Sequence, residues 1–254
     1  MEKRFHEFLQ FTDPHFLADP EGRLKNVHTR ESFSRVLDAA LAAESRPDGI
    51  LLTGDVTQDG SREGYVGIRA LLEATGIEVW SLSGNHDDPG NMAAVLSGGA
   101  FHYCEPIRAG SWLLPMLSTW DGDRGGGRIS DDDLAALDQL LANDPRPHAL
   151  VCLHHQPDPM GCAWLDGVAL DNREDFMAVI ERHEKVSGLL WGHVHQARDE
   201  QSGRLRLMST PSTCFQFIPH QDEFGLDPRP PGYRRLRLFE DGRIESEVVR
   251  VPAP

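Results

Sequence analysis

Five short apolar runs recur along the 254-residue chain, and each is followed by a segment that contains Asp, His or Asn. Short continuous apolar runs are typical of strands buried on both faces. Helical patterns separate several of these runs, and strands that alternate with helices predict an α/β fold. The runs cover residues 8–11, 49–53, 78–82, 148–153 and 188–191, and the polar residues after them are Asp13, His15, Asp55, Asn85, His86, His154, His155, His193 and His195.

Helices are predicted where apolar residues recur every three or four positions. One stripe covers residues 33–41, with Thr29 available as its N-cap, and Ser130 begins a capping box ahead of a second stripe at residues 134–141. In the tail, Leu alternates with Arg, and Asp241-Gly242 predicts a hairpin turn. No linker interrupts the chain, so we expect one domain over residues 1–254 with a β-rich part from about residue 204.

The polar residues at the five strand ends are expected to converge. In an α/β sheet the carboxyl ends of the strands share one edge, where ligands bind. Taken singly, an Asp after a strand is often a turn residue, and a lone His is more often part of the core. The presence of Asp, His or Asn at all five strand ends favours a metal site, because turns do not need histidine whereas first-row metals bind it.

The ligand types indicate which metals would bind. Imidazole nitrogen and carboxylate oxygen without thiolate suit Mn, Fe, Zn or Co, and are too rich in nitrogen for a dedicated Mg or Ca site. Seven ligands exceed the need of one ion, and with Asp55 bridging they divide between two. Two divalent ions would give the site a positive charge on a chain whose net charge is −15, so the site could accept a phosphate. Two such ions suit in-line phosphoryl displacement.

These motifs resemble, in order and spacing, those of the calcineurin-like metallophosphoesterases: DPH at 13–15, GD at 54–55, GNHD at 84–87, HHQP at 154–157 and GHVH at 192–195. The resemblance implies a four-layer αββα sandwich of two mixed sheets flanked by helices, a dimetal centre and phosphoester hydrolysis. It implies that Asp13, His15 and His195 hold one metal, that Asn85, His155 and His193 hold the other, and that Asp55 bridges. It also implies catalytic roles for Asp55, Asn85 and His86, with His86 as the general acid, and substrate contacts from Asn85, His86 and His195.

The choice between His154 and His155 rests on strand geometry. Adjacent residues on a strand point to opposite sides, so only one of the two is expected to reach the metal. We select His155, which stands two positions before Pro157 as the ligand of the family usually does. His154 is then expected to be a core residue or to support the ligands from behind.

A narrower resemblance, to the bacterial class III cyclic-nucleotide phosphodiesterases, rests on FLADPEGRL at 16–24, GCAWLDG at 161–167, TPSTCFQF at 210–217 and PGYR at 231–234. It implies hydrolysis of 3′,5′-cyclic AMP to 5′-AMP by attack of a metal-bridging hydroxide. The sequence departs from these relatives at residues 117–120, where they usually show Asp-Ser, and in the glycines at 125–127. We expect this departure to leave the metal centre untouched.

Composition limits the partners and the location. The net charge of −15, without a basic cluster, disfavours nucleic acid and anionic membranes. The first residues lack the apolar region of a signal peptide, no stretch approaches the length of a membrane span, and the four cysteines have no CxxC spacing. We therefore expect a cytoplasmic protein with reduced thiols and a small-molecule substrate. A homodimer is left open, because no stripe identifies an interface.

Two alternatives remain at this stage. The first is a broader phosphodiesterase or phosphomonoesterase, since the metal chemistry does not select the alcohol. The second is a non-catalytic scaffold, which is disfavoured because no ligand is missing. Three aromatic residues near the predicted site, Trp164, Phe215 and Phe217, are expected to pack in the core rather than against a nucleobase.

Overall fold

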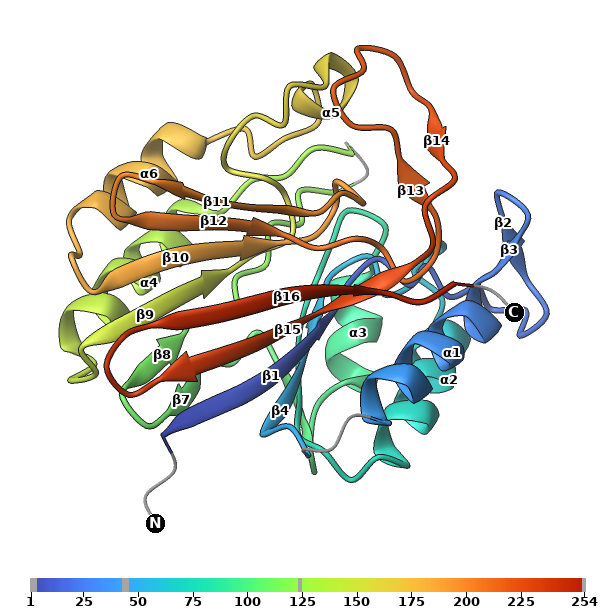
Figure 1. Ribbon diagram of the computed structural model, residues 1–254, viewed down its shortest axis with the longest axis horizontal. Helices are drawn as coiled ribbons and strands as arrows, with labels where there is room; N and C mark the ends of the chain where they lie inside the picture. The colour runs from blue at the N-terminus through green and yellow to red at the C-terminus, as the bar shows by residue number, and fades with distance from the viewer. Residues whose placement is uncertain (1–3, 43–45, 123–124, 253–254) are drawn as a thin grey trace.

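The computed structural model describes residues 4–42, 46–122 and 125–252. Within these ranges, two large sheets lie face to face and helices cover their outer sides (Figure 1). The helices are α1 (Thr29–Leu41), α2 (Arg62–Glu73), α3 (Pro89–Val95), α4 (Asp131–Asn143), α5 (Ala163–Asp166) and α6 (Arg173–Glu181). The strands are β1 (Phe5–Phe11), β2 (Arg23–Leu24), β3 (Val27–His28), β4 (Gly49–Thr53), β5 (Val79–Leu82), β6 (Phe101–Tyr103), β7 (Ile107–Ala109), β8 (Trp112–Leu114), β9 (His148–Cys152), β10 (Val186–Trp191), β11 (Arg198–Ser202), β12 (Leu205–Ser209), β13 (Gln216–Phe217), β14 (Leu226–Asp227), β15 (Gly232–Phe239) and β16 (Ile244–Arg250).

Both large sheets are mixed, with parallel strands in the middle. The order in the first sheet is β16-β15-β1-β4-β5-β6, and in the second it is β11-β12-β10-β9-β8-β7. Strands β1, β4, β5 and β6 run parallel, as do β8, β9, β10 and β12, whereas β7, β11, β15 and β16 add antiparallel neighbours. The five apolar runs of the sequence are therefore confirmed as the central strands β1, β4, β5, β9 and β10.

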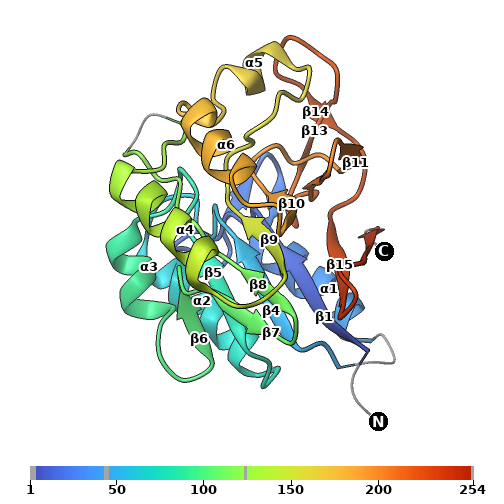
Figure 2. The same cartoon turned by 90° about the vertical axis from the view of Figure 1, so that its left-hand side faces the viewer.

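Three apolar clusters separate the layers of the fold. Leu9, Leu52 and their neighbours pack under α1, α2 and α3, whereas Phe8 and Leu51 point from the same strands into the space between the sheets. The third cluster joins the second sheet to α4 and α6 (Figure 2). Alternate residues of each central strand thus serve different layers, which is why these strands are apolar throughout. The predicted four-layer αββα sandwich is confirmed.

The local signals were correct at most element ends. Ser130 Oγ accepts a hydrogen bond from Asp133 N at 3.1 Å and caps α4. Asp241-Gly242 forms the turn between β15 and β16, as predicted. At α1 the prediction was wrong by one residue, because the His28 side chain accepts from Glu31 N and Thr29 begins the helix.

One buried arginine connects the two sheets. Arg234 on β15 is fully buried, and its guanidinium donates to Ser209 O and Arg198 O on the neighbouring sheet at 2.7 Å each. Asp199 on β11 supplies the countercharge at 2.8 Å. Burial would raise the pKa of Asp199, but a hydrogen bond from Arg206 and the charge of Arg234 hold that pKa below its usual value.

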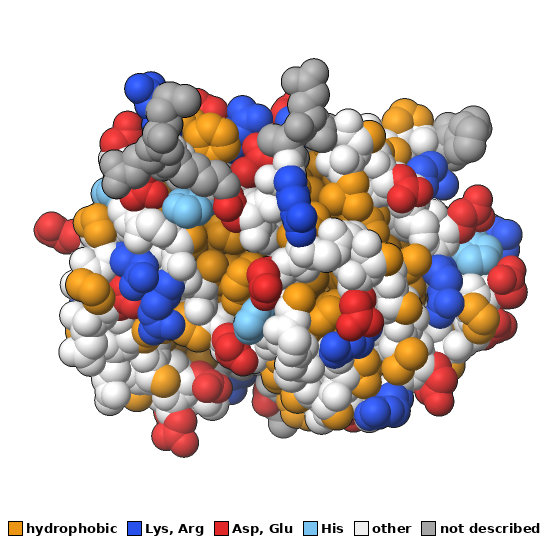
Figure 3. All heavy atoms as spheres, turned by 90° about the horizontal axis from the view of Figure 1, so that it is seen from below, with side chains coloured by type: hydrophobic (Ala, Val, Ile, Leu, Met, Phe, Trp, Pro, Cys, Tyr) orange, Lys and Arg blue, Asp and Glu red, His pale blue; other side chains and the backbone are white. Residues whose placement is uncertain are grey.

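The face drawn in Figure 3, seen from below the view of Figure 1, has no large basic patch among the described residues. Acidic and basic side chains are interspersed there, and hydrophobic side chains gather along the middle. A phosphate backbone would find no extended basic track on the part of the chain drawn in colour on this face. Among the described residues, no helix has the length and apolar character required to cross a membrane. All four cysteines are free thiols.

The Arg234–Asp199 pair gives the first prediction. Asp199→Asn should lower the free energy of unfolding by about 2 kcal/mol at neutral pH, because it leaves a buried guanidinium without its countercharge. Since the pKa of Asp199 is lower in the folded protein than in the unfolded chain, its contribution is present above the unfolded pKa and is lost as the pH falls. The difference between wild type and variant, measured by urea unfolding, should therefore shrink from roughly pH 5 downwards.

Asp241→Asn is the matched control for this experiment. Asp241 is 68% exposed and lies 4.0 Å from Arg243, and Asn fits the same turn. This variant should unfold like the wild type at every pH. An equal loss in both variants, or a loss in Asp199→Asn that does not change with pH, would contradict the assigned role of the buried pair.

Candidate metal centre

Backbone hydrogen bonds join the strand ends of the two sheets at one edge of the sandwich. Asp13 N donates to Gly54 O at 3.1 Å and His15 N donates to Asp55 O at 3.0 Å, so the loops after β1 and β4 run together. Across the sheets, His193 N donates to Asp13 Oδ2 at 3.1 Å. The predicted site residues are therefore brought to a common edge, as expected for the carboxyl ends of parallel strands.

Five of the predicted ligands have a backbone conformation that residues with a side chain rarely adopt. Their φ angles are positive, in the left-handed region, which costs on the order of 1–2 kcal/mol per residue. Such strain concentrates at functional sites, where the surrounding structure maintains it to aim side chains. The residues are Asp13 (52°), His15 (49°), Asp55 (47°), His193 (63°) and His195 (48°).

The first group of converging side chains consists of Asp13, His15 and His195. The Nε2 atoms of His15 and His195 lie 3.2 Å apart, and His195 Nε2 lies 3.3 Å from Asp13 Oδ1. His195 Nδ1 donates to Phe215 O at 2.8 Å, which leaves its Nε2 free to accept. Three buried acceptor atoms facing one another in this way repel, and a cation between them would remove that cost.

A second set of buried donor atoms belongs to Asn85, His155 and His193: the ligand atoms of the two histidines lie within 4.8 Å of each other, and Asn85 lines the same cavity as His193. Asn85 Oδ1 and both imidazole Nε2 atoms are buried and have no hydrogen-bond partner among the described residues. His155 Nδ1 lies 2.7 Å from Thr119 Oγ1, so its Nε2 is directed away from that contact. A hydrogen-bonded Nδ1 with a free Nε2 is the usual arrangement of a histidine that binds a metal.

His154 does not point away from the site, contrary to our expectation. Its ligand atom lies within 4.8 Å of those of His155 and His193, and its Nε2 is 3.4 Å from Asp55 Oδ1. The expectation was wrong because β9 ends at Cys152. Beyond that point the backbone is no longer extended, and the alternation of a strand does not apply.

Burial sets the charge of the histidines in both groups. It lowers the pKa of His15 to about 3 and the pKa of both His155 and His193 well below the usual range. For His154, burial is outweighed by the nearby carboxylate of Asp55, and the pKa is raised to about 9. The first three imidazoles are therefore neutral near pH 7, which is the form that binds metals.

The two aspartates are held in the ionised form. Burial would raise their pKa, but His195 beside Asp13 and His154 beside Asp55 keep both values below the usual range. Each carboxylate is also fixed by a donor on one oxygen: Thr12 Oγ1 donates to Asp13 Oδ2 at 2.6 Å, and His86 N donates to Asp55 Oδ1 at 2.9 Å. Their other oxygens are directed at histidines of the first group: Asp13 Oδ1 lies 3.3 Å from His195 Nε2, and Asp55 Oδ2 lies 3.9 Å from His15 Nε2.

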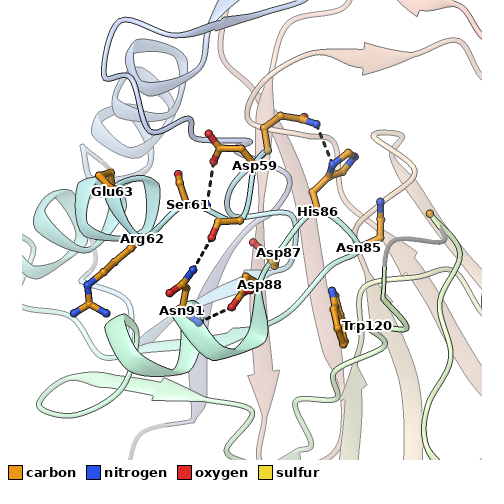
Figure 4. Close-up of a pocket in the computed structure, with 13 residues that line it drawn as sticks. Asp59, Ser61, Arg62, Glu63, Asn85, His86, Asp87, Asp88, Asn91 and Trp120 are labelled. Atoms are coloured by element: carbon orange, nitrogen blue, oxygen red, sulfur yellow. Dashed lines mark hydrogen bonds between the residues drawn. The ribbon is translucent and has the colours of Figure 1, made fainter.

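Two cavities open beside Asn85 and His86. One, of about 770 Å³, is polar and extends past Asp59 and Arg62 to Trp120. Figure 4 shows His86 and Asn85 along this cavity. The Gln58 amide contacts the His86 ring. The other, of about 370 Å³, reaches His15, His193 and His195 and is lined by aromatic side chains. His86 is partly exposed between them, so it can contact a bound molecule directly.

Comparison with known proteins gives the family. The sequence profile of the calcineurin-like phosphoesterases matches residues 6–197. The chain belongs to the calcineurin-like phosphoesterase family. It is 38% identical to a 3′,5′-cyclic adenosine monophosphate phosphodiesterase of Vibrio vulnificus over 96% of this chain and 90% of that protein, and 36% identical to one of Escherichia coli over 96% and 89%. A 3′,5′-cyclic-nucleotide phosphodiesterase of Nostoc is 33% identical over 99% and 94%.

Solved structures agree on the fold of this phosphoesterase. A dimetal phosphatase from Danio rerio superposes with a TM-score of 0.66, at 14% identity over 98% of this chain and 100% of the other. The protein TT1561 of Thermus thermophilus gives a TM-score of 0.59 at 14% identity, over 98% and 100%. Since sequence identity is low, these likenesses support the architecture alone.

The donor atoms of this phosphoesterase suit divalent metal ions. Several buried oxygen and nitrogen atoms lack partners in the described part of the chain, and an unsatisfied buried polar atom costs about 1–3 kcal/mol. Coordination to a cation would satisfy all of them at once. Among the proposed ligands, the atoms of this kind include Asp13 Oδ1, Asn85 Oδ1, His155 Nε2 and His193 Nε2.

One supporting residue was not identified from the sequence. Asp87 is buried and accepts hydrogen bonds from Val56 N, Thr57 N and Gly84 N at 2.9–3.2 Å, and from the Tyr65 hydroxyl at 2.9 Å. It thereby ties the loop that carries the Asp55 ligand to the loop that carries Asn85. Its place in the GNHD motif was the available signal.

The departure at residues 117–120 and 125–127 does reach the metal centre, which corrects our expectation. Thr119 contacts Nδ1 of the His155 ring, and Gly127 lies so close to the same ring that a Cβ atom would overlap its Nδ1 and Cγ atoms. The bridge between Gly127 and Leu170 fixes the loop in this position. The sequence could not indicate these contacts, because the loop is distant from His155 along the chain.

The Gly127 contact can be tested by adding one methyl group. Gly127→Ala should displace the His155 ring and weaken metal binding by about 10- to 100-fold, the usual effect of disturbing a residue that orients a ligand. The measurement is competition with a chelator, followed by metal analysis of the protein. Gly126→Ala is the control, because its Cβ would come no closer than 3.4 Å to other atoms. Wild-type affinity in Gly127→Ala would show that His155 is not held by this contact.

Proposed function

We propose that this phosphoesterase uses two divalent ions, Fe, Mn, Zn or Co, to hydrolyse 3′,5′-cyclic AMP to 5′-AMP. The similarity to cyclic AMP phosphodiesterases at up to 38% identity over nearly the whole chain carries this proposal. It is supported by the two groups of unsatisfied donor atoms at the strand ends. We further infer that the enzyme is a single-domain cytoplasmic protein that acts on a small molecule rather than on nucleic acid or membranes.

The two groups of donors suggest how the ions would be held. Asp13, His15 and His195 would hold one ion, and Asn85, His155 and His193 would hold the other. Asp55 suits the bridging position, because Oδ2 lies 3.9 Å from His15 Nε2 in the first group while Oδ1 lies 3.4 Å from His154 Nε2, whose ring is next to those of His155 and His193.

We assign His155 rather than His154 to the second ion. His154 Nδ1 lies 2.8 Å from Thr53 O and its Nε2 is directed at Asp55 Oδ1, the oxygen that also accepts from His86 N. This arrangement makes His154 a residue that orients the bridging carboxylate.

The chemistry then divides between the ions and the protein. When bound, two divalent ions neutralise charge on the phosphate and lower the pKa of water to near neutrality. Ring opening breaks the bond between phosphorus and the ribose 3′ oxygen, which then needs a proton. His86 is placed to give that proton, because it lies beside Asn85 and Asp55 at the junction of both cavities.

Gln58 sets the direction in which His86 acts. Its Nε2 lies 2.9 Å from His86 Nδ1, so the amide donates and Nδ1 accepts. In the neutral ring the proton is then on Nε2, which can donate a hydrogen bond to the departing oxygen. Proton transfer to that oxygen requires the imidazolium, which gives up its Nε2 proton and becomes a neutral ring with the remaining proton on Nδ1, where the Gln58 amide oxygen can accept after rotation of the amide. Asn85 and His195 would contact the phosphate beside it.

Broader action on small phosphodiesters or phosphomonoesters is the second candidate function. The cavity of about 770 Å³ beside His86 is polar and wide enough for other alcohols. The two candidates are separated by kcat/KM for cyclic AMP, cyclic GMP and a simple diester.

The main test combines metal content with turnover in one sample. Protein purified without chelator and reconstituted with Mn²⁺ or Fe²⁺ should bind about two ions per chain and convert cyclic AMP to 5′-AMP. His86→Ala should keep its metals and lose about 10²- to 10⁴-fold in kcat, the usual contribution of a general acid. His102→Ala, on the edge strand β6, is the control. Two bound ions and activity on bis(4-nitrophenyl) phosphate without cyclic AMP turnover would select the second candidate.

A substitution at Gln58 tests the proton position. Gln58→Glu places a carboxylate beside Nδ1, which stabilises the imidazolium and makes it a weaker acid, so kcat should fall by about 10-fold or more and its pH profile should move to higher pH. KM should change little, and Gln58→Asn should retain part of the activity. A wild-type kcat and pH profile in Gln58→Glu would remove Gln58 from the mechanism.

A further inference from the structure

The smaller of the two cavities is an extension of the metal centre with aromatic walls. It has a volume of about 370 Å³, and its lining passes from His15 and His195 to Phe217, Trp164 and Phe224. We call these last three residues the aromatic pocket. The expected core packing is confirmed in part, because Phe217 and Trp164 pack against the core cluster of the second sheet. Phe215 and Phe217 are only partly buried, however, and all three aromatic residues also line this cavity.

The rings of the aromatic pocket continue directly from a proposed metal ligand. Phe217 stacks on His195 with centroids 4.3 Å apart and an interplanar angle of 20°. Trp164 meets Phe217 edge to face at 4.8 Å, and Phe224 meets both rings, at 5.3 Å from Trp164 and 5.6 Å from Phe217. A planar group next to the phosphate would therefore find aromatic surface within one ring of the reacting centre.

Three separate segments were needed to build this pocket. Trp164 lies on α5, Phe217 and Phe224 belong to the loop of β13 and β14, and Lys25 reaches from the turn between β2 and β3. Figures 1 and 2 both show α5 beside the β13–β14 segment, above the carboxyl ends of the central strands. Such a construction, at the site itself, is unnecessary for holding metals.

Two features of the pocket are unexplained by packing. Phe224 is 50% exposed although it is a large hydrophobic residue, and Lys25 Nζ lies 5.3 Å above its ring. The indole N–H of Trp164 is buried and has no acceptor in the described part of the chain. A flat heterocycle with ring nitrogens would cover the exposed Phe224 ring and lie near the indole N–H of Trp164.

We propose that the aromatic pocket binds the purine base of the nucleotide, with the phosphate at the metal centre. This inference rests on the proposed function and deepens it by locating the base. The alternative location, the larger cavity, is lined by Asp59, Glu63, Asp88 and Arg62, and offers a base only Trp120 for stacking. Aromatic surface favours the smaller cavity.

The pocket is expected to recognise the shape of a purine rather than its substituents. Apart from the residues of the metal centre and His86, the polar groups in its lining are Lys25, Gln58 and the Trp164 indole N–H; Gln58 already contacts His86, and ring nitrogens that could accept from Trp164 are common to adenine and guanine. Stacking depends little on which base is present, because every base has a π-face. Adenine and guanine nucleotides should therefore bind within about fivefold of each other, whereas loss of the base should cost about 5- to 150-fold.

The test measures binding, so it does not depend on turnover of cyclic AMP. Isothermal titration calorimetry on the metal-loaded protein compares 5′-AMP with methyl riboside 5-phosphate, in which a methoxy group replaces the base; both are checked for integrity afterwards. Wild type should bind 5′-AMP at least fivefold more tightly. Phe224→Ala and Trp164→Ala should each reduce this preference several-fold, while the affinity for methyl riboside 5-phosphate is unchanged.

Trp120→Ala is the matched control, because Trp120 is an aromatic residue, 39% exposed, in the other cavity. It should keep the full preference. No preference in the wild type, or a preference lost in Trp120→Ala and kept in Phe224→Ala, would overturn the location of the base. If 5′-AMP is preferred through the aromatic pocket but cyclic AMP is not hydrolysed, the pocket stands and the proposed function fails.

Discussion

The mutual repulsion of buried donor atoms is the constraint on which the rest of this structure depends. Carboxylate oxygens and imidazole nitrogens from five strand ends face one another in a space from which water is largely excluded. Without a cation, their arrangement costs free energy, and so do the left-handed backbones of Asp13, Asp55 and His193. The hydrogen bonds that Asp87 accepts, and the bond from the Thr12 hydroxyl to Asp13, oppose relaxation of these loops. The fold therefore keeps the donor atoms close together although they repel one another in the absence of a cation.

The two sheets contribute different parts of this site, so their alignment matters as much as either sheet. Gln10 on β1 donates to Trp191 O at the end of β10, and Thr213 N donates to Thr12 O, both across the interface between the sheets. The buried Arg234 adds a further connection between β15 and the second sheet. Because these bonds are directional, a small slip of one sheet would break them. Polar contacts at the end of an otherwise apolar interface thus fix the relative position of the ligands.

The central strands, the layers and most of the site could be predicted from the sequence, because each depends on residues close together along the chain. Apolar runs, caps and the order of polar strand ends are local patterns, and the motif order adds the family. The contacts of His154, Thr119 and Gly127 could not be predicted, since they depend on how loops fold over the strand ends. The direction of the His154 side chain was predicted wrongly for a related reason. Strand alternation was applied to residues two and three positions beyond the end of β9.

The residues proposed to determine the type of reaction and those proposed to select the substrate lie in different parts of the chain. The family profile ends at residue 197, after the last proposed metal ligand, whereas Phe217 and Phe224 come later in the chain. The full-length relatives named as cyclic nucleotide phosphodiesterases align over 96% or more of this chain, including that tail. A metal centre recognises a phosphate and leaves the alcohol undefined. Selection of a nucleotide must therefore come from what surrounds the centre, and the tail supplies aromatic surface at the point where a base would extend from the phosphate.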